Sequence, residues 1–239
     1  IDELIRHSVS KLSHIHYTSN DAAKKRLIQM GELEQSIFTI GSPDVDIMFS
    51  DNLPDLDEVK QYYQIDFQTY GVAMYHPVTT EVDTIEDKAN HFVEALIESG
   101  GNYVVIYPNN DLGSKHMIKA YNKLRNNSRI KIFPSVRFEY FLTLLKNSMF
   151  IIGNSSAGVR EAPYYGVPSI NIGTRQANRV FTETISNIQG EKTIILSEIK
   201  KVVHHKKGAA QNLFGTGNSC ELFLESLSND EVWSISQQK

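Results

Sequence analysis

The sequence of 239 residues lacks several features, and each absence excludes a class of protein. No apolar run approaches the roughly 18 residues of a membrane-spanning helix. A single cysteine, Cys220, excludes a disulfide framework and a cysteine-based metal site. Lys and Arg total 24 against 28 Asp and Glu, a poor balance for binding nucleic acid. We therefore expect a cytoplasmic protein in a reducing compartment, with an inert thiol and with neither a membrane nor a nucleic acid as partner.

The chain also lacks an initiator methionine, and its first residues are polar and amphipathic, unlike a signal peptide. We expect it to begin inside a longer protein. Its length suits one large domain, or one smaller domain together with part of another.

Short apolar runs alternate with helical patterns from about Gln64 onward. The runs are continuous rather than alternating, which indicates strands buried on both faces of a parallel sheet with flanking helices. This α/β pattern predicts a Rossmann-like domain. The expected strands are "YGVAMYHP", "YVVIYP", "RIKIFP", "MFIIG", "PSINIG" and "KTIIL", and the expected helices cover 84–99, 114–126, 138–147, 156–165, 197–205 and 220–227.

The first 50 residues carry two further helix–strand pairs, too few to form a domain. The stretch 42–57 is rich in Pro, Asp, Asn and Ser, which marks a linker or boundary. We therefore predict that residues 1–50 are the end of a first Rossmann-like domain, that 51–228 are a second one, and that 229–239 are a tail.

Polar residues follow three of the predicted strands at their carboxyl ends, where ligands bind in such sheets. His76 follows the first strand, Asn109 with its neighbours 110–111 follows the second, and Asn154 with Ser155 and Ser156 follows "MFIIG". We expect these side chains to meet at one edge of the sheet.

The segment "GNSS" combines a turn residue with candidate helix caps. Gly153 permits a tight turn, and Ser155 or Ser156 is the expected N-cap of the next helix. The free N–H groups of a helix start form an anion site suited to a diphosphate, although a plain cap explains the same residues. Glu161 can accept hydrogen bonds from ribose hydroxyls or serve as a capping-box partner.

Two further side chains have a functional and a structural interpretation. Arg175, in the loop "GTRQANR" that also holds Arg179, suits a phosphate or a uracil carbonyl, and equally suits a solvated loop. His76 at a strand tip suits proton donation or a diphosphate contact, whereas an isolated His is more often structural. The histidines show no metal-binding spacing, so we expect no metal and no cofactor. "GNSSAG" also lacks the second glycine of a serine-hydrolase elbow, because Ala157 stands there.

Taken in order along the chain, several motifs resemble the hydrolysing UDP-N-acetylglucosamine 2-epimerases of sialic-acid biosynthesis. They are "IDELIRHSVSKLSHIH", "GSPDVDIM", "HPVTT", "PNNDLGSK", "GNSSAGVREAPYYGVPSINIGTRQ" and "GTGNS". The resemblance implies a fold of the glycosyltransferase-B type, with 51–228 as the UDP-binding domain and a homo-oligomeric enzyme. It implies conversion of UDP-N-acetylglucosamine to UDP and N-acetylmannosamine by elimination of UDP followed by hydration.

The resemblance also implies residue roles. His76 matches the histidine near the diphosphate and is the predicted catalytic residue. The predicted substrate-binding residues are Asn109, Ser155, Ser156, Glu161, Arg175, Asp46 and Arg6.

Two departures from the family pattern matter. The family's first third, with its proposed acid and base residues, is absent, so we expect these 239 residues alone to be inactive. Thr216 replaces an aspartate near the C-terminus, and the contact of that aspartate would be lost. Three other functions remain open: an epimerase for a UDP-2,4-diacetamido-2,4,6-trideoxy sugar of legionaminic-acid synthesis, a UDP-sugar glycosyltransferase, and a non-catalytic nucleotide-binding module.

Overall fold

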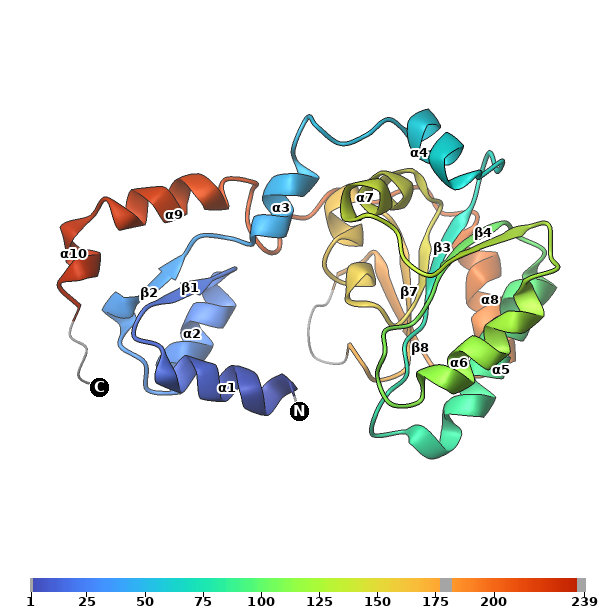
Figure 1. The fold of residues 1–239 in the computed structure, drawn as a ribbon, viewed down its shortest axis with the longest axis horizontal. Coiled ribbons are helices and arrows are strands. Elements are labelled where there is room, and N and C mark those ends of the chain that lie inside the picture. Colours follow the sequence, from blue (N-terminus) through green and yellow to red (C-terminus); the bar gives the residue numbers. More distant parts are fainter. Residues whose placement is uncertain (1, 177–181, 236–239) are drawn as a thin grey trace. The chain divides into compact units, whose positions relative to one another are not determined.

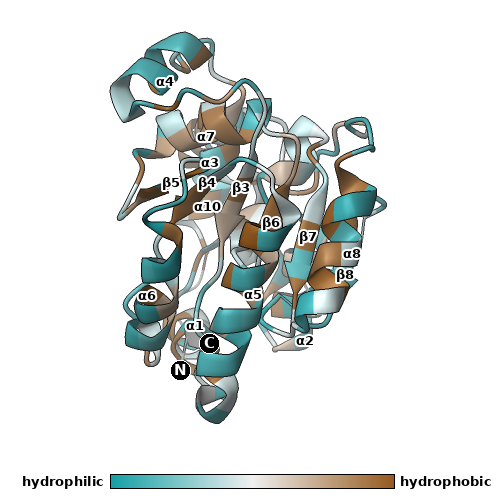
Figure 2. Cartoon of the chain, turned by 90° about the vertical axis from the view of Figure 1, so that its right-hand side faces the viewer, coloured by the Kyte–Doolittle hydropathy of each residue, from teal (hydrophilic) through white to brown (hydrophobic). Residues whose placement is uncertain are grey.

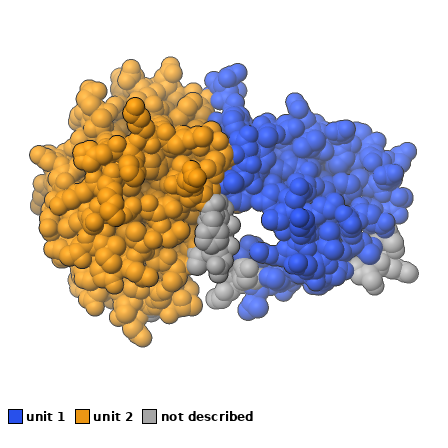
Figure 3. All heavy atoms as spheres, turned by 180° about the vertical axis from the view of Figure 1, so that it is seen from behind, with its two compact units in different colours: residues 1–52, 212–239 blue, residues 53–211 orange. Residues whose placement is uncertain are grey.

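A computed structural model describes residues 2–176 and 182–235. The chain divides into two compact units, coloured separately in Figure 3. Unit 1 contains Ile1–Asn52 and Asn212–Lys239, and unit 2 contains Leu53–Gln211. The boundary after Asn52 lies two residues from the predicted one. The second boundary differs, because the segment after Gln211 groups with unit 1 rather than with 51–228.

Unit 2 is built on a parallel six-stranded sheet of order β5-β4-β3-β6-β7-β8. The parallel sheet predicted from continuous apolar runs is therefore confirmed. Every residue of β4 and β7 is buried, as the pattern requires. The strands are β3 (Gly71–Met74), β4 (Tyr103–Ile106), β5 (Ile130–Phe133), β6 (Ile151–Gly153), β7 (Ser169–Ile172) and β8 (Ile185–Ile188).

Helices pack on this sheet and bury its apolar side chains. Helix α5 (Ile85–Ser99) lies between α6 (Ser114–Tyr121) and α8 (Lys192–Val202), and α4 (Leu56–Tyr63) packs on α7 (Phe138–Asn147) (Figure 1). Phe92 and Leu96 of α5 are fully buried in the core. Figure 2 shows brown strands β3 and β5 beside the mainly teal α5 and α6, so the helices turn their polar faces to solvent.

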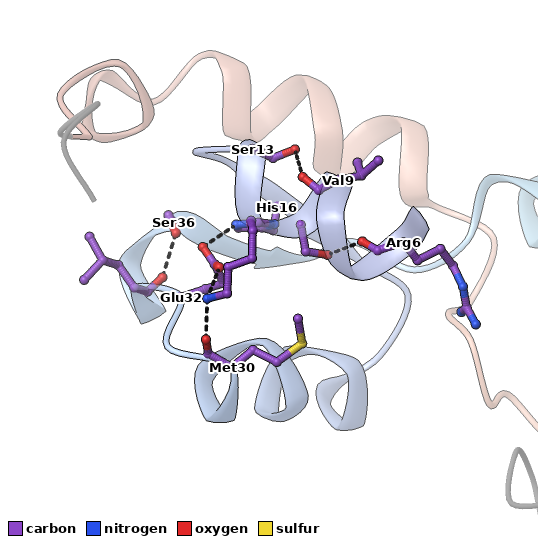
Figure 4. A network of polar contacts seen from close by, with 10 residues as sticks. Arg6, Val9, Ser13, His16, Met30, Glu32 and Ser36 are labelled. Carbon is purple, nitrogen blue, oxygen red and sulfur yellow. Dashed lines mark hydrogen bonds and ion pairs between the residues drawn. The ribbon is translucent and has the colours of Figure 1, made fainter. Parts of the chain in front are cut away.

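Unit 1 contains a parallel pair of strands, β1 (His16–Thr18) and β2 (Ile37–Thr39). Its helices are α1 (Asp2–Leu12), α2 (Asp21–Gln29), α3 (Pro43–Met48), α9 (Ser219–Leu227) and α10 (Asp230–Trp233). A buried carboxylate links several of these elements: Glu32 accepts from His16 Nε2 at 3.1 Å (Figure 4) and pairs with Lys11 at 2.8 Å. None of the described helices is long and apolar enough to cross a membrane.

Three predicted elements are wrong in the structure. The run "KTIIL" begins helix α8 rather than forming a strand, because Ile195, Ile199 and Val202 form a helical stripe in the core. The last strand is β8 instead, in a stretch with only two terminal apolar residues. The stretch 42–57, predicted as a linker or boundary, contains the division after Asn52. Its residues 43–48 nevertheless form α3 with Pro43 in the first turn, a favourable proline position.

The third wrong element is the helix predicted over 156–165. Two short 3₁₀ turns replace it, Ser156–Gly158 and Ala162–Tyr165. Pro163 cannot donate a hydrogen bond back along an α-helix, and Gly166 ends the second turn at φ 61°. The sequence between Gly153 and β7 therefore runs as a compact, buried loop.

Candidate functional site

Four neighbouring strands of unit 2 end in polar residues at the same edge of the sheet. β4, β3, β6 and β7 lie side by side and run in the same direction. Asn109, His76, Asn154 and Arg175 follow these strands and are joined by hydrogen bonds. The structure thus brings together residues that the sequence spreads over 100 positions. This is expected, because the carboxyl ends of parallel strands meet at one edge of the sheet.

The side chain of Asn154 forms two hydrogen bonds with the main chain of His76. Its Oδ1 accepts from the His76 N–H at 2.6 Å, and its Nδ2 donates to the His76 carbonyl at 2.8 Å. The main-chain N–H of Asn154 donates to the carbonyl of Met74 at 3.1 Å, which extends the β3–β6 pairing past the strand ends. Asn154 is 1% exposed, so water does not compete for these bonds.

The imidazole of His76 has a defined hydrogen-bonding state. Its Nδ1 accepts from the main-chain N–H of Asn109 at 3.0 Å, which leaves the proton on Nε2 in the neutral ring. Burial and the nearby charge of Arg175 lower the pKa of His76 from 6.5 to about 4, against the opposing effects of Asn109 and Asp111. Near neutral pH this group is an uncharged donor through Nε2.

The carbonyl of Asn154 accepts two hydrogen bonds from the loop after β7. Arg175 Nη1 donates at 3.1 Å and Gln176 Nε2 at 2.9 Å. Asn154 is predicted from the sequence to lie at this edge but is given no binding role there, and Gln176 is not predicted. Asn154 follows a predicted strand together with two serines in "GNSS", and this position indicates a site residue. The contact of Gln176 becomes visible only in the fold. Arg179, the second arginine of that loop, lies outside the described residues.

Two buried amide oxygens at this edge have no donor among the described residues. They are Asn109 Oδ1 and Gln176 Oε1, and Gln176 is 3% exposed. Burying an acceptor without a donor costs free energy, so such atoms are commonly satisfied by a ligand or a water. Asn109 Nδ2 is meanwhile engaged by Asp111. These oxygens suit hydroxyl or N–H donors of a ligand.

The serine pair belongs to a 3₁₀ turn rather than to an α-helix. Ser155 Oγ accepts from the main-chain N–H of Ala157 at 3.3 Å, which is the N-cap contact expected of it. The predicted contribution of an α-helix dipole is therefore lost, since one short turn aligns few peptide units. Ser155 is 9% exposed and Ser156 is half-buried, so the two hydroxyls differ in access to solvent.

Glu161 lies between the two 3₁₀ turns and is 9% exposed. Burial, and then the charge of Glu161, raise the pKa of the Tyr165 phenol well above its ordinary value. The carboxylate therefore sits close to an aromatic hydroxyl in a largely dry region, where its hydrogen bonds count for more than at the surface. Its predicted contact with a ribose stays a prediction.

Gly153 makes the close approach of β6 to β3 possible. Its φ is 138°, and a Cβ at this position would lie 1.9 Å from the carbonyl oxygen of Met74. No side chain fits there without separating the two strands. The tight turn predicted at Gly153 is thus explained by a backbone contact.

The two predicted site residues of unit 1 have separate surroundings. Both carboxylate oxygens of Asp46 accept hydrogen bonds at the start of α9, from Ser219 and Cys220. Burial raises the pKa of Asp46, but these bonds outweigh that effect and leave it below its ordinary value. Arg6 is exposed on α1 and lines a cavity of about 300 Å³ with Tyr17, Thr18 and other residues of unit 1.

A cavity of about 490 Å³ opens at the opposite, amino edge of the unit 2 sheet, beside Gly71, Tyr103 and Arg129. It shares no residue with the group formed by Asn109, His76, Asn154 and Arg175. In the described part of the chain, no three His, Cys, Asp or Glu side chains are placed to hold a metal ion.

Comparison with known proteins gives a consistent match. The family model described as UDP-N-acetylglucosamine 2-epimerase matches residues 1–228. The UDP-N-acetylglucosamine 2-epimerase of Neisseria meningitidis serogroup B is 47% identical over an alignment of 242 residues, which covers 100% of this chain and 64% of that relative. The UDP-N,N'-diacetylbacillosamine 2-epimerase (hydrolyzing) of Legionella pneumophila is 29% identical, over 92% of the chain and 59% of that relative. The chain thus spans less than two thirds of these relatives.

Solved structures show the same fold. A UDP-GlcNAc 2-epimerase from Neisseria meningitidis bound to UDP-GlcNAc matches with a TM-score of 0.73 at 15% identity, covering 92% of this chain and 62% of that one. The enzyme from Methanocaldococcus jannaschii matches with a TM-score of 0.71 at 23% identity, covering 92% and 63%. The predicted α/β fold of the glycosyltransferase-B type is confirmed by this likeness.

Proposed function

The chain belongs to the UDP-N-acetylglucosamine 2-epimerase family, and we propose that its protein is the hydrolysing enzyme of that family. It would convert UDP-N-acetylglucosamine to UDP and N-acetylmannosamine, at the start of sialic-acid synthesis. The observation that supports the proposal most directly is the hydrogen-bonded group at the ends of four strands. In it His76, Asn109 and Arg175 lie around Asn154 at one edge of the sheet.

The proposed role of these residues is to hold the leaving nucleotide. In the elimination of UDP a base, which the resemblance places in the family's first third, takes the proton from C2, and a double bond forms between C1 and C2. The bond between C1 and the diphosphate oxygen breaks, and negative charge builds up on that oxygen. Donors placed in advance around the oxygen stabilise the charge as it develops. His76 Nε2 and the guanidinium of Arg175 are donors of this kind, and the hydroxyls of Ser155 and Ser156 add to them.

His76 acts in this proposal as a neutral donor. Its Nδ1 is occupied by the Asn109 N–H, so the ring presents Nε2–H and cannot also accept a proton at Nδ1 without breaking that bond. A diphosphate placed near the ring raises its proton affinity, because opposite charge favours the imidazolium. Glu161 would accept from the ribose hydroxyls, and the buried oxygens of Asn109 and Gln176 would accept from other donors of the nucleotide.

A second substrate has specific support. The Legionella relative is named for a diacetamido sugar, and its 29% identity extends over 92% of the chain. Contacts with the diphosphate and the ribose do not select the substituents of the sugar. The proposed UDP site around His76, Asn154 and Arg175 is therefore compatible with both substrates. A UDP-sugar glycosyltransferase is a third possibility, and it would need an acceptor. A homo-oligomer stays a prediction from the resemblance.

The test is to incubate the full-length protein with UDP-N-acetylglucosamine and, separately, with UDP-2,4-diacetamido-2,4,6-trideoxyglucose. UDP release and the product sugar are followed by proton NMR. Release of UDP with free N-acetylmannosamine supports the main proposal. Release only from the diacetamido sugar supports the second substrate, and release only with an added acceptor supports a transferase.

The site assignment has its own test in UDP affinity, measured by calorimetry. Ser156→Ala and Glu161→Ala should each weaken binding by about tenfold, the effect of one lost charge-assisted or buried hydrogen bond. Ser197→Ala on the exposed side of α8 is the matched control and should bind like the parent. Unchanged affinity in both site variants would remove Ser156 and Glu161 from the nucleotide site.

A further inference from the structure

We propose that Asn154 is a positioning residue, whose side chain sets the place of His76 and whose carbonyl sets the place of Arg175. The inference rests on the proposed function, because it assigns Asn154 to the reaction in which those two residues hold the leaving group. Asn154 itself is 1% exposed and lies behind them. It would therefore act through its neighbours and not by touching the reacting atoms.

The first support is the two-point contact with His76. A donor and an acceptor on one amide meet the N–H and the carbonyl of a single residue, at 2.6 and 2.8 Å. Two bonds to one peptide stretch fix its orientation as well as its distance. Only an amide of this length offers both polarities, since an aspartate in the ionised form accepts but does not donate.

The second support is the carbonyl of the same residue. It accepts from Arg175 and Gln176 at 3.1 and 2.9 Å, although these residues lie 21 and 22 positions further along the chain. Two donors on one acceptor hold the loop after β7 against the end of β6.

The third support is the rigid base on which Asn154 stands. Gly153 presses against the Met74 carbonyl, and the Asn154 N–H donates to that same oxygen at 3.1 Å. Both contacts are with Met74 of β3, so the residue is fixed to the β3–β6 pair in the middle of the parallel sheet. Groups supported in this way are preorganised, so little reorganisation remains when charge develops on a ligand.

The consequence concerns the spacing of the imidazole and the guanidinium. Asn154 holds the main chain that carries the imidazole through its side chain, and it holds the guanidinium through its own main-chain carbonyl. Moving Asn154 therefore alters the hydrogen bond from Asn109 to His76 Nδ1 and the approach of Arg175 together. The nucleotide would lose two aligned donors at once, which shows mainly in the chemical step.

The test compares Asn154→Asp with the parent in the full-length protein. The variant keeps the acceptor for the His76 N–H but loses the donor to the His76 carbonyl. We expect kcat for UDP release to fall by about 10- to 100-fold, the usual cost of losing a supporting contact, with a much smaller change in KM. In a His76→Ala background the same substitution should change kcat less than about threefold, because residues that act as a unit are not additive.

A second readout does not depend on turnover. Nitrogen-15 NMR of the labelled protein reports which imidazole nitrogen carries the proton. In the parent His76 should show the Nε2–H form, and Asn154→Asp should shift its signals. Asn171→Asp is the matched control: Asn171 is buried at 3% on the adjacent β7, and its Nδ2 donates to Asn187 Oδ1 at 2.7 Å. It should leave the His76 signals unchanged.

The outcomes separate the two hypotheses. An unchanged kcat and unchanged His76 signals in folded Asn154→Asp would overturn the positioning role, as would equal losses in Asn171→Asp. Failure of the parent to release UDP from either sugar would refute the proposed function, while the NMR comparison would still test the positioning of His76. If Asn154→Asp does not fold, Gln176→Leu removes one donor to the Asn154 carbonyl, and no effect on kcat there would count against the proposal.

Discussion

Asp46 caps the start of helix α9 at Ser219, which lies 173 positions further along the chain. Its Oδ1 accepts from the Ser219 N–H at 3.0 Å, and its Oδ2 accepts from the Ser219 hydroxyl at 2.8 Å and the Cys220 N–H at 2.9 Å. The local N-cap residue, Asn218, makes no side-chain cap bond. A carboxylate from α3 therefore satisfies the free donors that every helix start presents.

Replacing this capping carboxylate should destabilise unit 1. We expect Asp46→Ala to lower the free energy of unfolding by about 1–3 kcal/mol, the cost of losing a cap with charged hydrogen bonds. The lowered pKa of Asp46 means that this contribution is present above its unfolded-state pKa and disappears as the pH falls through the lower folded-state pKa. Urea denaturation at several pH values measures it. Asp51→Ala, at an exposed position of the same unit, should stay within about 0.5 kcal/mol of the parent.

We expect the buried carboxylate of Glu32 to contribute more to the free energy of unfolding than the exposed carboxylates near it. Its side chain is 2% exposed and pairs with His16, which is 6% exposed, and with the half-exposed Lys11. We expect Glu32→Ala to cost about 3 kcal/mol, because removing this carboxylate leaves the buried His16 without its ion-pair partner. Glu34→Ala is the control, since the Glu34–Lys24 pair spans 3.5 Å and Glu34 is 72% exposed. If chemical denaturation gave Glu32→Ala and Glu34→Ala the same loss of unfolding free energy, burial of the Glu32 ion pair would not explain its contribution.

We expect burial and the charge of Arg175 to lower the pKa of His76. Its pKa of about 4 lies below the ordinary 6.5, so the unfolded chain binds a proton first as the pH falls. His76 thus leaves stability unchanged above pH 6.5 and reduces it between 6.5 and about 4. Proton NMR of the ring measures the pKa directly. Arg175→Gln should raise it, because a neighbouring positive charge is removed. A pKa near 6.5 in the parent would refute the buried, Arg-flanked environment.

Two glycines with positive φ should respond differently to alanine. At Gly153 a Cβ meets the Met74 carbonyl oxygen at 1.9 Å, whereas at Gly173 no atom lies within 4 Å. Gly173→Ala should therefore cost only the backbone strain of φ 76°, about 1–2 kcal/mol. We expect Gly153→Ala to cost well over 3 kcal/mol or to prevent folding, because β3 and β6 must separate. Similar melting temperatures for the two variants would contradict this contact.

The residues that we propose for the nucleotide site are largely predictable from the sequence. His76, Asn109 and Ser155 each follow an apolar run that has to be a buried strand, and parallel strands put their carboxyl ends at one edge. The length and order of the motifs also pointed to the family. Gln176 was missed because its contact is with a main-chain carbonyl, which no residue pattern encodes.

Local sequence patterns are enough to predict the parallel α/β sheet and the polar residues at its carboxyl edge, because an apolar run and the residues that follow it are local features of the chain. Three matters depend on the tertiary structure. It made "KTIIL" a helix, since Ile195 and Ile199 meet the core only at helical spacing. It joined α9 to the first 52 residues through Asp46. And it made Asn154 the centre of the site, because bonds to His76 and Arg175 form only after β3, β6 and β7 are side by side.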